Sequence, residues 1–158
     1  MSVSTKFKIN KVPQILKEIS KMKKSYVSVG VHEKAKDYSN GASVQMIARV
    51  HEFGSTNTPY PIPERSFLRS TYDENEAKIG NDLKNSLWDI TNGKTTAKKE
   101  LSKIGFEIRE KTKTKIEKLK DPPNAESTAK QKGFDNPLIR TRHLKNSIDF
   151  EVHIKWDF

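Results

Sequence analysis

Apolar residues recur at helical spacing over two long stretches of the chain. The first stretch, residues 64–90, has a stripe formed by Leu68, Tyr72, Ile79, Leu83 and Leu87. The second, residues 95–119, has a stripe formed by Leu101, Ile104, Ile108, Ile116 and Leu119. Such spacing places each set on one helical face. Because the turn signal Thr91-Asn92-Gly93 separates the stretches, we expect two long helices paired as a hairpin.

Strict alternation of apolar and polar residues predicts two strands. In residues 25–32 the apolar positions are Val27, Val29 and Val31. In residues 148–156 they are Ile148, Phe150, Val152, Ile154 and Trp156, and we expect Phe150 and Val152 to be buried. A period of two is that of a strand with one buried face. Weaker alternation at residues 6–10 predicts a third, short strand.

Shorter elements complete the predicted fold. A helix begins at Val12-Pro13, another spans residues 43–53, and one helical turn contains Leu144. We expect Ser43 to cap the second of these helices and Gly54 to end it in a left-handed conformation. The chain is therefore predicted to be one α+β domain over residues 1–158, with a small, mostly antiparallel sheet packed against two long helices.

Two segments are too polar and too rich in proline to form the core. Residues 55–64 contain three prolines, and residues 120–135 contain Pro122-Pro123 and almost no apolar side chain. No long helix can cross the first segment. We interpret the first as an extended arm and the second as an exposed loop, and we expect both to contact partners.

Composition indicates a modest core and a strongly basic surface. Hydrophobic residues make up 33% of the chain, charged residues 32%, and the net charge is +10. Residues 94–120 contain ten Lys or Arg and four Glu, a difference of +6. A basic surface attracts polyanions, so nonspecific nucleic-acid binding is one hypothesis. Phe106 is the one aromatic residue in this segment, which argues against base stacking.

No pattern in the sequence predicts catalysis, a cofactor or a metal. The segment NGKTT at residues 92–96 resembles the end of a phosphate-binding loop, but Trp88 stands where that loop needs glycine. His51-Glu52 begins like a zinc-protease helix, but Ser55 stands where the second ligand belongs. There is no cysteine, no apolar core of a signal peptide and no apolar run of transmembrane length. We therefore expect a protein that is not an enzyme.

Three ordered motifs carry a family resemblance. The first contains Ala48, Glu52, Phe53 and Gly54; the second contains Ile62, Pro63, Arg65, Phe67 and Leu68; the third contains Pro137, Leu138, Thr141, Leu144, Ser147 and Ile148. With the strand at 27–31 and the long helix between them, they resemble the small neck and tail-completion proteins of tailed bacteriophages. The chain departs from the family pattern at Ser66, where a second proline is usual, and at Arg142, where glycine is usual.

The resemblance implies a structural virion protein that forms a ring, with six copies, where head joins tail. It could be a neck, tail-completion or tail-terminator component, made in the host cytoplasm. Its partners would be copies of itself and the adjacent head-closure, connector and tail proteins. DNA would pass through the lumen without specific binding, and no membrane would be involved. The basic segment would then face solvent or acidic neighbours rather than the lumen, because lumenal cations would hold phosphates.

The resemblance and the residue types together suggest eight candidate assembly-interface residues. They are Glu52, Phe53, Pro61, Pro63, Arg65, Phe67, Arg140 and Arg142. Arginine and aromatic residues are enriched at interfaces. Alternatively, Phe53 and Phe67 pin the loop onto the core of their own domain. A nonspecific nucleic-acid-binding protein is the leading functional alternative, and a small phage enzyme is the third.

Overall fold

The computed structural model describes residues 10–56 and 59–155. Its elements, in chain order, are α1 (Val12–Lys24), β1 (Tyr26–Val31), α2 (Val44–Phe53), α3 (Arg69–Thr91), α4 (Ala97–Lys118), α5 (Glu126–Lys132), α6 (His143–Asn146) and β2 (Ile148–His153). The predicted α+β class is confirmed, as are both main strands and the helical hairpin. The strand predicted at 6–10 falls almost entirely outside the described residues.

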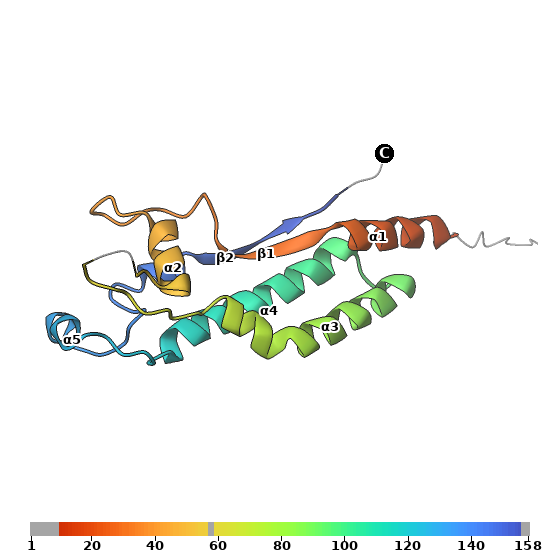
Figure 1. The fold of residues 1–158 in the computed structure, drawn as a ribbon. Helices are drawn as coiled ribbons and strands as arrows, with labels where there is room; N and C mark the ends of the chain where they lie inside the picture. The colour runs from red at the N-terminus through yellow and green to blue at the C-terminus, as the bar shows by residue number, and fades with distance from the viewer. Residues whose placement is uncertain (1–9, 57–58, 156–158) are drawn as a thin grey trace, which may run out of the picture.

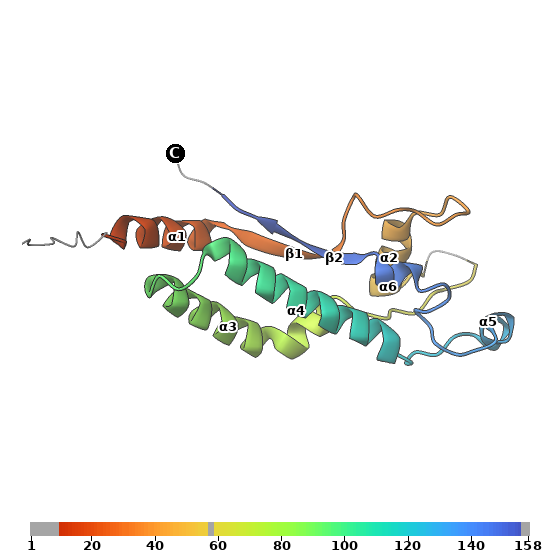
Figure 2. The same cartoon turned by 180° about the vertical axis from the view of Figure 1, so that it is seen from behind.

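Helix α4 is the central element of the molecule. The antiparallel pair β1–β2 lies along one side of α4, and α3 runs back along the other side (Figures 1 and 2). In the pair, Val27 lies opposite Val152, and Val29 lies opposite Phe150. Far-separated parts of the chain therefore meet on one helix, which explains why α4 has the long buried stripe that the sequence predicts.

Glycine at position 105 lets the strand pair approach the α4 backbone. A Cβ atom on Gly105 would lie 2.6 Å from both Phe150 Cδ2 and Val27 Cγ2, well inside van der Waals contact. Phe150 and Val152 are half-buried rather than buried as predicted. The Phe150 ring reaches past Gly105 toward the Arg109 guanidinium, which lies 5.5 Å from the ring centroid.

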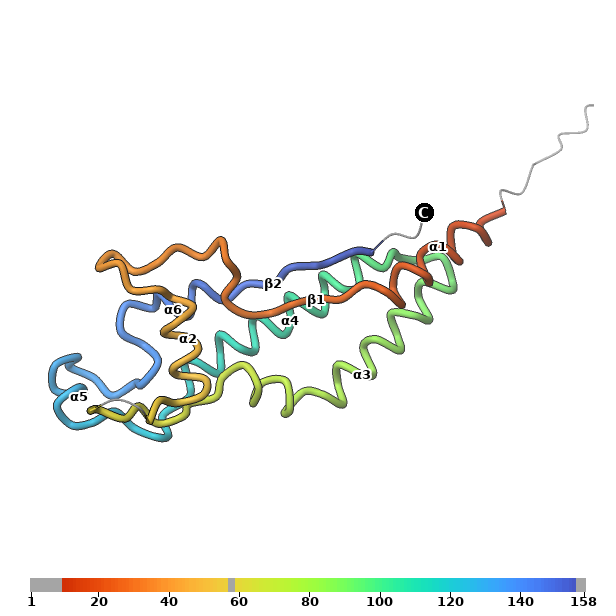
Figure 3. The backbone as a smooth tube through the Cα atoms, turned by 45° about the horizontal axis from the view of Figure 1, so that its top comes forward, coloured from red at the N-terminus to blue at the C-terminus, as the bar shows by residue number. Residues whose placement is uncertain are grey.

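The apolar core is divided between the two ends of the molecule. One cluster, near α2 and α6, consists of Val44, Ala48, Phe67, Ile116, Leu138, Leu144 and Ile148. The other, near α1, consists of Met22, Ile90, Ala97 and Leu101. Figure 3 shows α1 at one end of the elongated fold and α2, α5 and α6 at the other. Helix α4 contributes to both clusters and so connects them.

Most of the apolar stripe predicted for α3 does not face the core, although Leu68, just before the helix, packs against the first cluster. The helix begins at Arg69 instead of 64, and its buried residues are Thr71, Ser86 and Ile90. Polar groups join α3 to α4: Ser86 Oγ donates to Glu100 Oε2 (3.1 Å), Lys78 Nζ donates to Glu107 Oε2 (2.8 Å), and Lys111 bonds Asn75. The exposed apolar residues of α3, here called the α3 stripe, are Tyr72, Leu83, Leu87 and Trp88. The prediction failed because helical spacing identifies a face but not what covers it.

Three smaller predictions also need correction. Residues 120–135 are not all loop, because they contain the short helix α5. Strand β2 ends at His153, before the predicted 156. Gly54 ends α2 at φ 72° and ψ 177°, a positive-φ conformation that is not the left-handed helical one. No helix in the described part of the chain has the length and hydropathy of a membrane span.

Replacing Gly105 by Ala should destabilise the fold, and replacing Gly80 by Ala should stabilise it. Both glycines lie inside helices, where alanine is favoured by about 1 kcal/mol. No atom lies within 4 Å of a Cβ added at Gly80, whereas one added at Gly105 collides with two side chains. We expect Gly105→Ala to lose about 1–3 kcal/mol through overpacking. Urea unfolding followed by circular dichroism measures both; equal effects would contradict the close approach described here.

Candidate assembly surface

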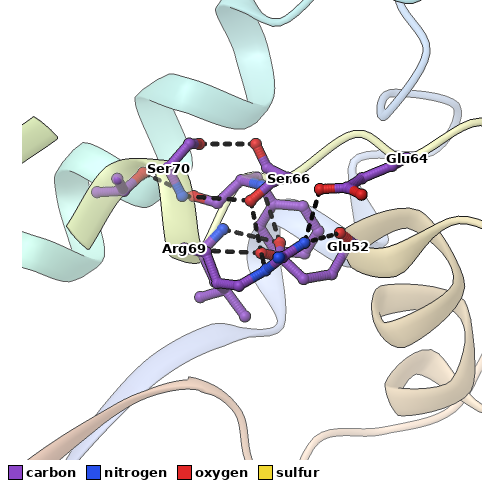
Figure 4. Close-up of polar contacts among 8 residues, drawn as sticks. Glu52, Glu64, Ser66, Arg69 and Ser70 are labelled. Atoms are coloured by element: carbon purple, nitrogen blue, oxygen red, sulfur yellow. Dashed lines mark hydrogen bonds and ion pairs between the residues drawn. The ribbon is translucent and has the colours of Figure 1, made fainter. Parts of the chain in front are cut away.

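The carboxylate of Glu52, at the end of α2, caps the beginning of α3 (Figure 4). Its Oε2 accepts hydrogen bonds from the backbone N–H groups of Phe67 (2.8 Å) and Leu68 (2.9 Å). Its Oε1 accepts from Ser66 Oγ (2.7 Å), Arg69 N (2.9 Å) and Arg69 Nε (3.2 Å). The first N–H groups of a helix have no partner within the helix. Glu52 therefore supplies from another element the cap that α3 lacks.

The Glu52 side chain is charged although it is buried. The residue is 3% exposed. Burial alone would raise the pKa of the carboxyl, but hydrogen bonds from the Leu68 and Arg69 N–H groups, from Ser66 and from Phe67 outweigh it. The pKa therefore lies below its ordinary value, and the helix begins on an ionised carboxylate, which the helix dipole also favours.

The segment after α2 folds back on itself, so that the chain comes close to Glu52 again before α3 begins. Ser55 and Ile62 exchange two backbone hydrogen bonds of 2.8 and 2.9 Å, so the segment is not the extended arm that we predicted. The chain turns at Gly54, where an added Cβ would lie 3.0 Å from Glu64 N and Ile62 O. Positive φ and this close approach both require glycine there. Residues 57 and 58 of the loop lie outside the described residues.

Arg65 connects the two proline-rich segments. Its guanidinium donates from Nε to Pro122 O (2.7 Å) and from Nη2 to Pro123 O (2.6 Å). Its backbone N–H donates to His51 O (2.7 Å), and the whole residue is 5% exposed. The two segments that the sequence marks as separate loops are therefore held together at one place.

The structure separates the eight candidate interface residues into buried and exposed groups. Glu52, Arg65 and Phe67 are buried, and Phe67 is 0% exposed. For Phe67 the alternative that it anchors the loop to its own core is therefore the one observed. Phe53, Pro61 and Pro63 are exposed beside it. Arg140 and Arg142 are exposed too, but they line a different hollow.

The exposed group forms an apolar surface around Phe53. Two adjoining hollows share Phe53, Gly54 and Ser55. The apolar residues that line them, here called the Phe53 patch, are Met46, Val50, Phe53, Pro61, Ile62 and Pro63. Phe53 is 59% exposed, and the Arg69 guanidinium lies 4.6 Å from its ring centroid. The patch therefore exposes an aromatic ring at the end of α2. The hydrogen bonds of Glu52 fix the position of this helix end.

The two departures from the family pattern have different structural outcomes. Ser66 donates to Glu52 and accepts a hydrogen bond from Ser70 N (3.2 Å), so its hydroxyl makes contacts that proline could not. Arg142 has φ 61° and ψ 6°, the left-handed conformation for which glycine is suited. The backbone at 142 thus has the conformation that glycine favours, although the residue is arginine.

The basic segment 94–120 is partly neutralised within the chain. Four of its ten basic residues form ion pairs among the described residues: Lys94 with Asp89, Arg109 with Asp149, Lys111 with Glu107, and Lys115 with Glu74. Glu74, near the beginning of α3, meets Lys115, near the end of α4, because the hairpin is antiparallel. The other six, all lysines, form no ion pair with a described residue.

The enzyme-like motifs have structural roles. The NGKTT turn ends α3 and begins α4, where Thr96 Oγ1 accepts from Lys99 N (3.4 Å) and Glu18 Oε2 accepts from Ala97 N (3.0 Å). His51 packs inside the fold beside Arg65 and Lys132. Burial, then the charges of Arg65 and Lys132, lower the pKa of His51 to about 4. No three His, Asp or Glu of the described residues are placed to hold a metal ion.

Replacing Glu52 by Gln should destabilise the protein far more than replacing Glu64 by Gln. The amide introduced at position 52 would turn donors toward buried N–H groups, and each unsatisfied donor costs about 1–3 kcal/mol. We expect a loss of at least about 2 kcal/mol in urea unfolding. Glu64 is an exposed partner of the same Arg69, at 2.7 Å, so Glu64→Gln should cost under about 1 kcal/mol. Similar losses in the two variants would contradict the capping role.

Acid should weaken the fold in two separate pH windows. The unfolded chain protonates His51 near the ordinary histidine pKa of 6.5, whereas the folded chain does so only near 4. Stability should therefore fall by up to about 3 kcal/mol as pH drops from 6.5 to 4. The pKa of Glu52 is lowered. Its contribution to the free energy of unfolding is therefore present above pH 4.5 and is lost as the pH falls further. Urea unfolding of His51→Gln across this range should lack the first loss and keep the second; an unchanged profile would contradict the assignment.

Comparisons with known proteins do not identify this chain. No protein-family model, no curated protein and no solved structure matches it. The function is therefore inferred from the residues and from the geometry described above.

Proposed function

We propose that this chain is a structural virion protein of a tailed phage that assembles into a ring at the head-to-tail junction. It would act as a neck, tail-completion or tail-terminator component, and it would work by assembly rather than catalysis. The family resemblance supplies the location and the six copies. Its partners would be copies of itself and the adjoining head and tail proteins.

The single observation that carries the proposal is the exposed Phe53 patch on a rigid base. The Glu-Phe-Gly motif and the Pro-x-Arg-x-Phe-Leu motif meet in space, because Glu52 of the first binds the N–H groups of the second. Phe67 and Arg65 are buried on the inner side of this junction. Phe53 and its apolar neighbours lie on the outer side. Apolar surface held in one conformation loses little entropy when a partner covers it.

A second exposed apolar surface supports ring formation. A ring of identical subunits needs two different complementary surfaces on each copy. The α3 stripe and the Phe53 patch are on different elements, and both expose aromatic residues. The polar contacts between α3 and α4 leave the α3 stripe free for a neighbouring subunit.

Nonspecific nucleic-acid binding is a second candidate function, and six lysines of the 94–120 segment support it. They form no ion pair among the described residues, so they could neutralise phosphates. Such binding would weaken steeply with salt, whereas assembly through apolar patches would not. This difference separates the two candidates.

Replacing Phe53 by Ser should weaken self-association of the purified protein. Loss of an exposed aromatic residue at the centre of an interface costs about 2 kcal/mol or more, a weakening of at least about thirtyfold. Light scattering after size exclusion should show a closed oligomer for the unchanged chain and smaller species for the variant. Electron microscopy should show rings only for the former, and particles lacking this protein should contain heads and tails that have not joined.

Phe106→Ser provides a matched control for this experiment. Phe106 is 52% exposed, and the Arg109 guanidinium lies 4.6 Å from its ring centroid, as Arg69 does from Phe53. This variant should assemble like the unchanged chain. Equal assembly of all three proteins would contradict a role for the Phe53 patch. A monomer whose DNA affinity falls steeply with salt would favour the nucleic-acid alternative.

A further inference from the structure

A hollow of about 540 Å³ lies where α2, α5 and the segment before α6 meet. These elements gather at one end of the molecule (Figure 3). Its cationic lining residues are Lys132, Arg140 and Arg142, and two histidines, His51 and His143, also line it. No Asp or Glu is among the described residues that line it. The hollow is therefore a concave site with charge of one sign.

The arginines of this hollow have no direct partner within the described part of the subunit. Arg140 and Arg142 form no hydrogen bond or ion pair there, and Glu117, on which the charge of Arg142 acts, is bonded to Lys145. Lys132 Nζ donates to Asn136 O (2.6 Å) and to Pro137 O (3.4 Å), which are uncharged acceptors. On α4, in contrast, lysines such as Lys111 and Lys115 meet carboxylates.

Two half-buried groups of the hollow, Lys132 and His51, have lowered pKa values. Burial is the largest cause of the lowered pKa of Lys132; the charge of Asp135, the next largest, raises it, and the charges of Arg65 and Arg140 lower it. His51 responds in the same way, to burial and then to Arg65 and Lys132, which lower its pKa. Burial is the largest cause of both shifts, and neighbouring cations add to it.

The backbone at Arg142 adds a second, independent observation. Its φ of 61° is the one positive value among the described residues other than glycine. Such a conformation is disfavoured for a residue with a Cβ. Glycine would relieve this strain but would remove the guanidinium from the rim of the hollow. Strain that is retained at a charged residue points to a function for the side chain.

The shape and lining of the hollow favour a carboxylate from a peptide. Guanidinium groups bind carboxylates through two parallel hydrogen bonds. Thr128 and Gln131 add uncharged donors, and Ile47, Leu138 and Leu144 add an apolar wall. Asn124 also lines the hollow, but its amide donates to Asp135 Oδ1 (2.8 Å). A nucleic-acid duplex presents phosphates on its outer surface but no apolar side chain that could meet the wall. The Tyr38 ring packs against His143, with centroids 4.4 Å apart, and is not free for base stacking.

We propose that this hollow, lined by Arg140, Arg142 and Lys132, is a binding site for an acidic segment of a protein partner. Carboxylates of the segment would pair with the two arginines, and an apolar side chain beside them would meet the wall. The inference does not depend on the proposed function, because it requires no ring and no phage.

Fluorescence anisotropy with a labelled peptide of alternating Glu and Leu tests the site in the full chain. The peptide should bind saturably, and Arg140→Gln combined with Arg142→Gln should weaken it at least about tenfold, since two charge-assisted contacts are lost. Lys98→Gln combined with Lys99→Gln removes the same charge from the beginning of α4 and should change the affinity little. Circular dichroism should show that all variants are folded.

Arg142→Gly and two competitors make the test decisive. Arg142→Gly relieves the backbone strain, so it should raise the thermal unfolding temperature while weakening peptide binding. Equal binding by the arginine and lysine double variants would overturn the proposal. Displacement of the peptide by equimolar inorganic phosphate would also overturn it, by assigning the hollow to a small anion. A short DNA duplex that binds more tightly than the peptide, and loses that affinity in the arginine variant, would assign it to nucleic acid.

Discussion

The buried carboxylate of Glu52 is the interaction on which the α2–α3 end of the fold depends. It joins the end of one helix to the beginning of another through five hydrogen bonds. Because these bonds include backbone N–H groups that α3 cannot satisfy itself, the position of α3 is tied to α2. The same bonds hold Phe67 in the core and leave Phe53 outside. Both the fold and the candidate assembly surface therefore depend on one ionised side chain.

Helix α4 has the corresponding role at the scale of the whole molecule. Its buried residues extend from Ala97 to Ile116 and contribute to both apolar clusters. The strand pair rests on its glycine at 105, and α3 is joined to it by polar groups. A two-stranded sheet is marginal by itself and needs a helix to cover one face. The low hydrophobic content of the chain is sufficient because each layer packs against this one helix.

Charge is distributed unevenly over this framework. On α4, carboxylates from α3 neutralise part of the basic run. At the hollow beside α5, the arginines form no such ion pair with a described residue. Net charge alone therefore says little about where an anion would bind, since the location depends on which cations lack a nearby carboxylate. The Phe53 patch and the cationic hollow are different surfaces of this chain.

The sequence by itself determined most of the elements, though not α5, because local spacing and turn residues act over a few positions. Ser43 as a cap, the Thr91-Asn92-Gly93 turn and the alternation after Ile148 all predicted structure that is present. Only the tertiary structure decided which faces are covered. It buried Thr71 and Ser86 rather than Tyr72 and Leu87, and it placed the buried carboxylate of Glu52 at the beginning of α3. It also brought Arg65 to Pro122 and gathered the cations around His51. These outcomes depend on contacts between distant residues, which local periodicity does not encode.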